Sequence, residues 1–150
     1  MKVLLLGSTG MVGSALKKSL TARESIEVIG VARADADLTC DLSDETQLIN
    51  ILNFKNFDMV INAAALANID YCEKYSLDSW NINAKLVSYL ASYSNDLDIP
   101  LLHISTDHFY NYGENQPHNE NDQIFCINEY ARHKFAAEAF ALTSKNSLVV

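Results

Sequence analysis

The sequence predicts a doubly wound α/β protein, in which helices cover both faces of a parallel sheet. Two observations carry this prediction. Short apolar runs alternate with segments of helical spacing along the chain, and a glycine-rich turn joins the first such run to the first helix. Strands that alternate with helices are joined by right-handed crossovers, so the helices cover both faces of the sheet. The expected class is a Rossmann-like domain, in which such a turn opens a nucleotide site.

The expected elements follow a regular order. Lys2 to Leu6 is a short apolar run that stops at Gly7, and apolar residues then recur at helical spacing as far as Leu20. Acidic residues within 43–45 favour the start of a second helix, because carboxylates stabilise a helix N-terminus. Further strands are expected over 26–31, 57–61 and 99–104, an acidic loop over 35–41, helices over about 73–94 and over 128–142, and a long loop over 105–127. Loops of that length in compact domains are usually functional.

The chain stops in an apolar, strand-like run, residues 147–150. No closing element follows this run. We therefore expect the sheet to be truncated before its last strands and the protein to continue beyond Val150. A complete small domain is the alternative.

Composition narrows the class of protein. The 150 residues fit one domain, and 49% hydrophobic residues suffice for a single core. A net charge of −8 argues against nucleic acid or an anionic membrane surface as a partner, because both require a basic patch. No apolar run approaches the ~20 residues of a membrane span and no cleavage-site pattern is visible, so we expect a cytoplasmic protein. Neither the three cysteines nor the four histidines have metal-ligand spacing, and no metal site is expected.

The glycine-rich turn has the pattern Gly7-x-x-Gly10-x-x-Gly13. The first glycine allows the tight turn, the second lets the backbone approach a phosphate, and the third permits close packing of helix on strand. A chance glycine turn is the alternative, but this one follows a strand and opens a helix, which favours dinucleotide binding. The residues of the turn expected to contact the cofactor are Gly7, Thr9, Gly10, Met11, Val12 and Gly13.

Three loops are expected to meet at one crevice. Gly7, Asn62 and Ser105 each follow the end of an expected strand. In parallel sheets of this kind, ligands bind beyond the carboxyl ends of the strands.

A tyrosine and a lysine lie four residues apart, at Tyr130 and Lys134. Residues with this spacing share one face of a helix, so the ammonium of Lys134 would favour the ionised form of the Tyr130 phenol. That makes a proton donor usable near neutral pH. Together with a pyrophosphate site, the pair indicates nicotinamide-dependent carbonyl chemistry.

Nearly the whole chain resembles the extended short-chain dehydrogenase/reductase family. Asp41-Leu42 looks like the family's pair at the adenine edge, and Asn62-Ala63-Ala64-Ala65 looks like its loop that passes the cofactor. The stretches 68–73 and 80–84 also match it. The resemblance thus implies that Asp41, Leu42, Ala63, Ala64 and Ala65 bind the cofactor, together with Tyr130 and Lys134.

Within this family the chain is most similar to the branch of dTDP-4-dehydrorhamnose reductases. The likeness rests on Ser105-Thr106-Asp107 after the fourth strand, on Asn128-Glu129-Tyr130 before Lys134, and on Ala136-Ala137-Glu138 just beyond. It implies NAD(P)H-dependent reduction of a 4-keto-6-deoxy sugar nucleotide, in nucleotide-sugar and cell-surface polysaccharide biosynthesis. Dehydration is disfavoured, because the family's 4,6-dehydratases carry a glutamate where this chain has His108.

The resemblance also implies roles for single side chains. Tyr130 would protonate the carbonyl oxygen, Lys134 would lower the pKa of the tyrosine and hold the nicotinamide ribose, and Thr106 would orient the carbonyl. Ser105, Thr106 and Asp107 are the expected substrate contacts; hydroxyls that merely cap the loop are the alternative for Ser105 and Thr106. Ala131 replaces a usual glycine, and the loop from His108 to Tyr112 differs from the family's.

The cofactor is expected to be NADPH or NADH, with NADPH preferred. NAD specificity usually needs an acidic residue at the end of the second strand, whereas this chain has Ala32 followed by Arg33. An arginine there can pair with a 2′-phosphate. Asp35 and Asp37 lie close enough in sequence to oppose this inference.

Two other functions stay open. One is a sugar-nucleotide epimerase or another reductase of the same family, and the other is a non-catalytic NADP-binding regulatory protein. The expected organisation is an NAD(P)-binding domain over 1–150, with the substrate-binding part beyond Val150 and a homodimer as one expectation for the full-length protein. These 150 residues alone are expected to bind a dinucleotide weakly and to be inactive.

Overall fold

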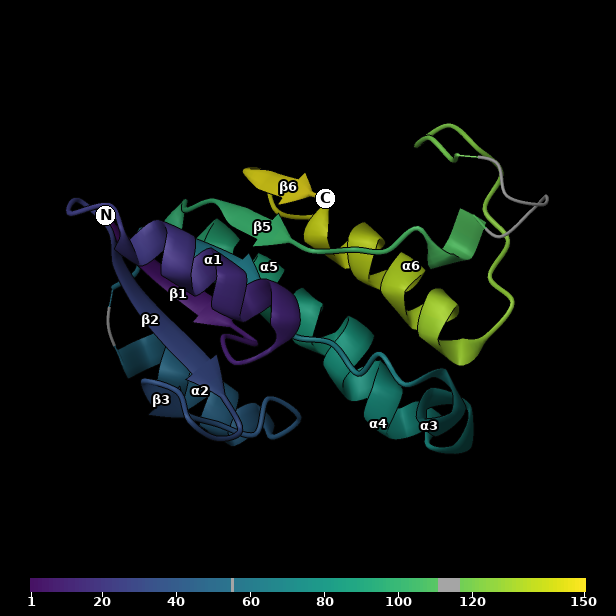
Figure 1. Ribbon diagram of the computed structural model, residues 1–150, viewed down its shortest axis with the longest axis horizontal. Helices are drawn as coiled ribbons and strands as arrows, with labels where there is room; N and C mark the ends of the chain where they lie inside the picture. The colour runs from purple at the N-terminus through teal and green to yellow at the C-terminus, as the bar shows by residue number, and fades with distance from the viewer. Residues whose placement is uncertain (55, 111–116) are drawn as a thin grey trace.

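The computed structural model describes residues 1–54, 56–110 and 117–150. Within them, six strands form one parallel sheet in the order β3-β2-β1-β4-β5-β6 (Figure 1). The strands are β1 Lys2–Leu6, β2 Glu27–Ala32, β3 Leu38–Thr39, β4 Met59–Asn62, β5 Leu101–His103 and β6 Ser147–Val149. This order confirms the expected doubly wound, Rossmann-like class.

Helices cover both faces of the sheet, as expected. The helices are α1 Met11–Thr21, α2 Glu45–Phe54, α3 Ile69–Lys74, α4 Ser76–Trp80, the π-helical turn η1 Asn81–Lys85, α5 Leu86–Leu97, the 3₁₀ turn η2 His108–Tyr110 and α6 Glu129–Ala141. Alternate residues of β1 serve the two sides, because side chains along a strand point to opposite faces. Leu4 and Leu6 join the larger core with α2, α5 and α6, whereas Val3 and Leu5 join a smaller cluster with α1.

The strand order reverses between β1 and β4. From β1 the chain moves outward through β2 to β3, and it then returns to β4 on the other side of β1. The loops that leave β1 and β4 therefore diverge to opposite faces and leave a crevice at their carboxyl ends. Both strands are buried in the core, so this crevice rests on a rigid base.

The long helical region expected over about 73–94 is present, with one interruption at Tyr75. The segment is divided into α3, α4, η1 and α5. The break after α3 falls at Tyr75, whose φ of −126° and ψ of 62° are not helical. Apolar spacing of three and four residues continues across such interruptions, so periodicity alone does not reveal them.

The expected acidic loop over 35–41 contains the short edge strand β3, which pairs with β2 through Leu38 and Thr39. Two paired residues leave no apolar run to detect. The strands expected over 57–61 and 99–104 are β4 and β5, and both are shorter than expected. The loop expected over 105–127 includes η2. The part of that loop with Tyr112 and Gly113 lies outside the described residues.

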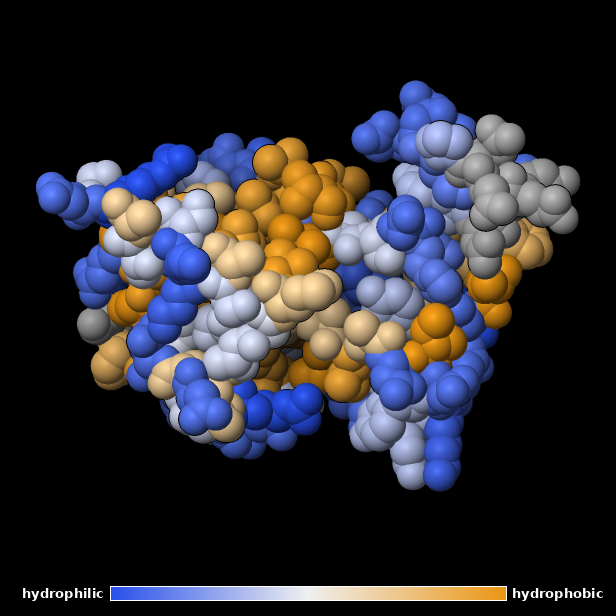
Figure 2. Space-filling model, in the orientation of Figure 1, coloured by the Kyte–Doolittle hydropathy of each residue, from blue (hydrophilic) through white to orange (hydrophobic). Residues whose placement is uncertain are grey.

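The far edge of the sheet carries exposed apolar side chains. Leu148 of β6 and the following Val150 are both more than half exposed. Figure 2 shows apolar side chains gathered on the face where β5 and β6 lie near α1. Among the described helices, none has the length and apolar character needed to cross a membrane.

Candidate functional site

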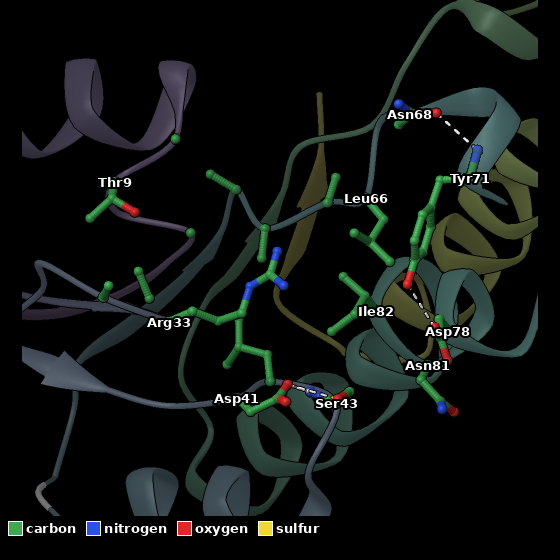
Figure 3. Close-up of a pocket in the computed structure, with 18 residues that line it drawn as sticks. Thr9, Arg33, Asp41, Ser43, Leu66, Asn68, Tyr71, Asp78, Asn81 and Ile82 are labelled. Atoms are coloured by element: carbon green, nitrogen blue, oxygen red, sulfur yellow. Dashed lines mark hydrogen bonds between the residues drawn. The ribbon is translucent and has the colours of Figure 1, made fainter. Parts of the chain in front are cut away.

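A cavity of about 790 Å³ opens at the carboxyl ends of β1, β2 and β4 (Figure 3). Nine of the residues expected to bind a cofactor line it: Gly7, Thr9, Gly10, Arg33, Asp41, Leu42, Ala63, Ala64 and Ala65. They come from four separate stretches of the chain. The crevice expected from strand order and the cofactor residues expected from sequence thus coincide.

The glycine turn is built without room for side chains at two of its three glycines. Gly7 has a φ of +74°, and a Cβ on it would lie 2.6 Å from the Ala64 nitrogen. A Cβ on Gly13 would lie 2.1 Å from the Gly7 oxygen, so helix α1 approaches β1 as closely as the third glycine allows. Gly10 is different, because its Cβ would meet only the Gly7 oxygen, at 3.3 Å. Its open side faces the cavity.

The N-terminus of α1 suits an anion. Gly10 is the N-cap residue and has no side chain to bond the first N–H groups of the helix. A phosphate placed there would accept those hydrogen bonds and meet the positive end of the helix dipole. Met11 and Val12 belong to this first turn and are exposed, but neither they nor the buried Gly13 line the cavity.

The charged side chains near the end of β2 differ in whether they are paired with other residues. Arg33 is exposed and extends into the cavity (Figure 3). Asp37 is held by other residues, because its Oδ2 accepts hydrogen bonds from Lys17 Nζ and from the Gly30 N–H, both at 2.7 Å. The Lys17 hydrogen bond holds the pKa of Asp37 below its usual value. Asp41 accepts from the hydroxyl and the N–H of Ser43, at 2.7 and 3.0 Å, and these bonds lower its pKa.

The opposite wall of the cavity was not expected from the sequence. Its residues come from the loop after β4, α3, α4 and η1, and they include Leu66, Asn68, Tyr71, Asp78, Asn81 and Ile82. The Tyr71 hydroxyl donates to Asp78 at 2.9 Å. The resemblance of 68–73 and 80–84 to the family is the only sequence signal for this wall, and it implies no site role for these residues.

One buried asparagine shapes this wall. Asn83 of η1 accepts from the Leu66 N–H at 2.8 Å and donates to the Leu66 oxygen at 2.9 Å. Both backbone groups of Leu66 are thereby satisfied, and the loop after β4 is tied to the helical layer. Single π-helical turns within α-helices often occur at functional sites, and here Asn81 and Ile82 of that turn line the cavity.

Helix α6 carries the expected catalytic pair outside the lining of this cavity. Tyr130 is half-buried, and burial raises the pKa of its phenol, while the nearby Thr106 side chain lowers it. Lys134 is 1% exposed, and its Nζ donates to the Ile104 oxygen at 2.5 Å and lies 3.2 Å from His103 Nε2. Burial lowers the pKa of Lys134 to about 8.

The expected lowering of the Tyr130 pKa by Lys134 stays a prediction. The spacing of the two residues is correct, but the amine of Lys134 is drawn inward by the Ile104 carbonyl and His103. The dominant influence on Tyr130 is burial, which disfavours the phenolate.

The residues after β5 differ in their burial and in their hydrogen-bond partners. Thr106 Oγ1 accepts from the His108 N–H at 3.2 Å, and its side chain also influences the pKa of Tyr130 on α6. The Ser105 hydroxyl is buried without a partner in the described part of the chain, whereas Asp107 is exposed. His108, found where dehydratases carry glutamate, accepts at Nε2 from the amide of Asn128 at 2.9 Å.

Phe109, in the loop that differs from the family's, is 1% exposed and packs in the core. Among the described residues, no group of three His, Cys, Asp or Glu side chains could hold a metal ion. Cys40, Cys72 and Cys126 are free thiols.

The sheet order, the glycine turn and the crevice at the point where the strand order reverses define a Rossmann-like α/β domain of the kind that binds dinucleotides. The model of the RmlD substrate-binding domain family matches residues 1–150, and the chain belongs to this family. This confirms the resemblance to dTDP-4-dehydrorhamnose reductases.

Similar sequences and solved structures support this family assignment. A dTDP-4-dehydrorhamnose reductase of Sinorhizobium fredii is 27% identical over 97% of this chain and 47% of its own length. A structure of a hypothetical dTDP-4-dehydrorhamnose reductase from Sulfolobus tokodaii has a TM-score of 0.87 and 33% identity, over 99% of this chain and 54% of that one. A dTDP-4-dehydrorhamnose reductase from Bacillus anthracis, solved in complex with NADP, shares the fold with a TM-score of 0.85 and 23% identity, over 99% of this chain and 51% of that one. The chain spans about half the length of these relatives.

Proposed function

We propose that this chain is the cofactor-binding part of a reductase that uses NAD(P)H to reduce the C4 ketone of a 4-keto-6-deoxy sugar nucleotide. The observation that carries the proposal is that the Thr106 side chain comes close enough to the Tyr130 phenol to lower its pKa. It brings together two side chains from separate elements, each expected to act on a carbonyl oxygen. Family membership supports the same chemistry, since named relatives are dTDP-4-dehydrorhamnose reductases.

The cavity fits a dinucleotide. Gly7 and Gly10 present backbone where a side chain would obstruct a pyrophosphate, and the open N-terminus of α1 offers N–H donors to it. Asp41 and Leu42 would lie at the adenine end, and Ala63, Ala64 and Ala65 along the remainder of the cofactor. When bound, the nicotinamide supplies the hydride that reduces the ketone carbon.

The proton comes from the chain. Burial keeps Tyr130 in its phenol form, which is the form that can give a proton to the carbonyl oxygen as the carbon is reduced. The Thr106 hydroxyl would donate a hydrogen bond to the same oxygen and hold it in place. The phenolate left behind regains its proton from solvent, which completes the balance of the reaction.

We also propose that NADPH is preferred over NADH. Arg33 is exposed in the cavity, whereas Asp37 is paired with Lys17 and Asp41 with Ser43. Of the two aspartates that oppose this preference, Asp37 is thus paired with a lysine, and Asp35 is exposed and does not line the cavity. An arginine suits a 2′-phosphate because its planar fork of donors matches phosphate oxygens.

The test uses the full-length protein with NADPH and dTDP-4-dehydrorhamnose. We expect the absorbance of the reduced nicotinamide to fall in proportion to substrate, with a product that carries two additional hydrogens by mass spectrometry. Interconversion of sugar epimers without net cofactor oxidation would instead indicate an epimerase. Cofactor binding without any conversion, across a set of 4-keto sugar nucleotides, would indicate a regulatory protein.

A further inference from the structure

Helix α6 begins against α3 and α4 (Figure 1). At this junction both the backbone and the side chain of Glu129, the first residue of α6, are bound by the other two helices. The Glu129 N–H donates to Glu73 Oε1 of α3 at 2.7 Å, and Glu129 Oε2 accepts from the Ser76 hydroxyl of α4 at 2.5 Å. Arg132, within α6, donates to Glu129 Oε1 at 2.7 Å. Glu129 immediately precedes Tyr130, so these bonds fix the turn of helix that carries the proposed proton donor.

A second set of hydrogen bonds continues from Glu129 toward the cavity. Glu129 Oε2 lies 3.3 Å from His133 Nε2, and His133 Nδ1 lies 2.9 Å from the Ser79 hydroxyl oxygen. That oxygen accepts from Asn83 Nδ2 at 3.1 Å. Asn83 in turn bonds to both backbone groups of Leu66, which lines the cavity. Ser79, Asn83 and His133 are buried, so a polar line from Leu66 to Glu129 crosses the helical layer without interruption.

The two ends of the polar line fix the direction of its hydrogen bonds. The Leu66 N–H can only donate, so the Asn83 oxygen accepts from it and the Asn83 nitrogen donates to Ser79. At the other end the carboxylate of Glu129 can only accept, so His133 Nε2 carries a proton. Burial lowers the pKa of His133, so the ring is neutral near pH 7 and its Nδ1 accepts from the Ser79 hydroxyl. Each donor of the three side chains between the ends thus has an acceptor.

The carboxylate of Glu129 is held in its charged form. The hydrogen bond from Ser76 lowers its pKa most, and Arg132 and His133 lower it further. Glu129 and Glu73 raise the pKa of His133 and Arg132 lowers it, but burial has the largest effect on that ring. A charged acceptor therefore ends the polar line, and hydrogen bonds to a charged group are stronger than those between neutral groups.

We propose that Glu129, His133 and Ser79 are positioning residues that hold the Tyr130 phenol at a fixed place relative to the cofactor cavity. One end of the polar line is part of the cavity wall, and the other end is the residue before Tyr130. If the first turn of α6 moved along α4, the donors of His133 and Ser79 would lose their acceptors in a buried place. An unsatisfied buried donor is costly, so the two parts of the site are held together.

The catalytic consequence rests on the proposed function. There Tyr130 gives its proton to the carbonyl oxygen while the nicotinamide gives its hydride to the neighbouring carbon. A displacement of about 1 Å from the reactive geometry can lower the rate on the order of 10²-fold. Neither Glu129 nor His133 lines the cavity, so their loss should lower kcat and leave cofactor binding intact.

The first measurement reports the place of Tyr130 without any turnover. The full-length protein is labelled with fluorotyrosine, and the ¹⁹F signal of Tyr130 is identified by its loss in Tyr130→Phe. The difference in ¹⁹F shift between H₂O and D₂O measures the exposure of the ring to solvent. In the wild type we expect one narrow signal with a partial solvent shift, because Tyr130 is half-buried.

Two substitutions of His133 separate the two ends of the polar line. His133→Gln places an N–H near the position of Nε2 and can keep the bond to Glu129. His133→Asn places an oxygen near the position of Nδ1 and can keep only the bond from Ser79. We expect the Tyr130 signal to broaden and its solvent shift to rise in His133→Asn, and to stay close to the wild type in His133→Gln.

Two further variants act at Glu129 itself. Glu129→Gln keeps the shape but turns an NH₂ group toward the donors of Arg132 or His133, so the Tyr130 signal should change as in His133→Asn. Ser76→Ala removes one bond to Glu129 at a partly exposed position, which gives the same test with little risk to folding. Glu45→Gln is the matched control, because this first-turn glutamate of α2 is likewise bound by a hydroxyl and an ammonium. It should leave the Tyr130 signal unchanged.

The second measurement is the reductase assay with the same variants. We expect kcat to fall by about tenfold in Glu129→Gln and in His133→Asn, while the KM for the sugar nucleotide and the Kd for NADPH stay within about twofold. A loss of stability alone would not divide kcat from KM in this way. Urea unfolding checks that each variant is folded.

An unchanged Tyr130 signal in Ser76→Ala and Glu129→Gln would overturn the proposal, and so would equal changes in the two His133 variants. The ¹⁹F measurement needs no turnover. The expected signals in a protein without reductase activity would therefore support the positioning role and reject the proposed function alone. Reductase activity with unchanged signals would reject the positioning role alone.

Discussion

At the scale of single residues, Tyr130 combines two properties that a proton donor requires. It is half-buried, which raises the pKa of the phenol, and the Thr106 side chain lies close enough to influence that pKa, so a second hydroxyl is near. Neither property depends on a charge from Lys134. The burial of the side chain is therefore as important to the proposed reaction as its place in the Tyr130–Lys134 pair.

Replacing Tyr130 by phenylalanine removes one oxygen and little volume. In the full-length protein we expect kcat to fall by the ~10²- to 10⁴-fold typical of losing a positioned proton donor, while the Kd for NADPH stays within about twofold. Stopped-flow or steady-state assays measure the first, and fluorescence titration measures the second. Wild-type turnover in the variant would make Tyr130 a packing residue.

Arg33 decides the cofactor preference in the proposed site. In Arg33→Ala we expect the affinity for NADPH to fall by about tenfold, corresponding to the ~1.5 kcal/mol of a charge-assisted hydrogen bond, with little change for NADH. Arg23→Ala is the matched control, because Arg23 is an exposed arginine in the turn before β2, at the opposite end of that strand from Arg33. An equal ratio of the two affinities before and after Arg33→Ala would contradict the NADPH preference.

At the scale of elements, two short structural features form the cavity. The glycine turn lets α1 begin against the end of β1, and the π-helical turn η1 directs Asn83 onto the backbone of Leu66. The first makes the floor of the cavity and the second ties down the opposite wall. Each of these turns depends on a close approach to the backbone of another segment, which few substitutions can preserve.

The glycines of the turn should respond differently to alanine. In Gly13→Ala the new methyl group meets the Gly7 backbone at 2.1 Å, so we expect the free energy of unfolding to fall by about 2–3 kcal/mol or more. Gly10→Ala meets only the Gly7 oxygen at 3.3 Å, and it should cost less than about 1 kcal/mol while weakening dinucleotide binding. Urea unfolding and cofactor titration of both variants measure this. Equal losses of stability would mean that the turn rearranges.

At the scale of the whole molecule, the buried imidazole of His103 links stability to pH. Burial lowers its pKa to about 3, below the 6.5 of an exposed histidine. Between these values the unfolded chain binds a proton that the folded chain does not. Stability is therefore complete above about pH 6.5 and falls as the pH is lowered toward 3.

Unfolding in urea between about pH 7.5 and pH 4.5 measures this dependence. We expect the wild-type protein to lose on the order of 1 kcal/mol per pH unit through His103, and His103→Gln to lack this part of the slope. Carboxylates contribute to both proteins in this range, so the difference between them isolates the histidine. Parallel slopes would show that His103 is not held neutral in the fold.

The sequence by itself determined the alternation of strands and helices, the glycine turn and the pairing of Tyr130 with Lys134 on one helix. These are local properties, because periodicity and turn chemistry depend on residues a few positions apart. For the same reason nine of the expected cofactor residues lie together in the cavity: they sit at the ends of strands whose order follows from right-handed connections.

Only the tertiary structure decided the far wall of the cavity, the division of the long helix and the partners of Lys134. Tyr71 and Asp78 meet, and Asn83 reaches Leu66, across gaps that no local pattern encodes. Lys134 shares a helical face with Tyr130, yet its amine donates to the oxygen of Ile104, which follows β5. The physical reason is that a buried amine takes the partners that compensate its lost hydration, and those partners are brought to it by the packing of α6 on the sheet.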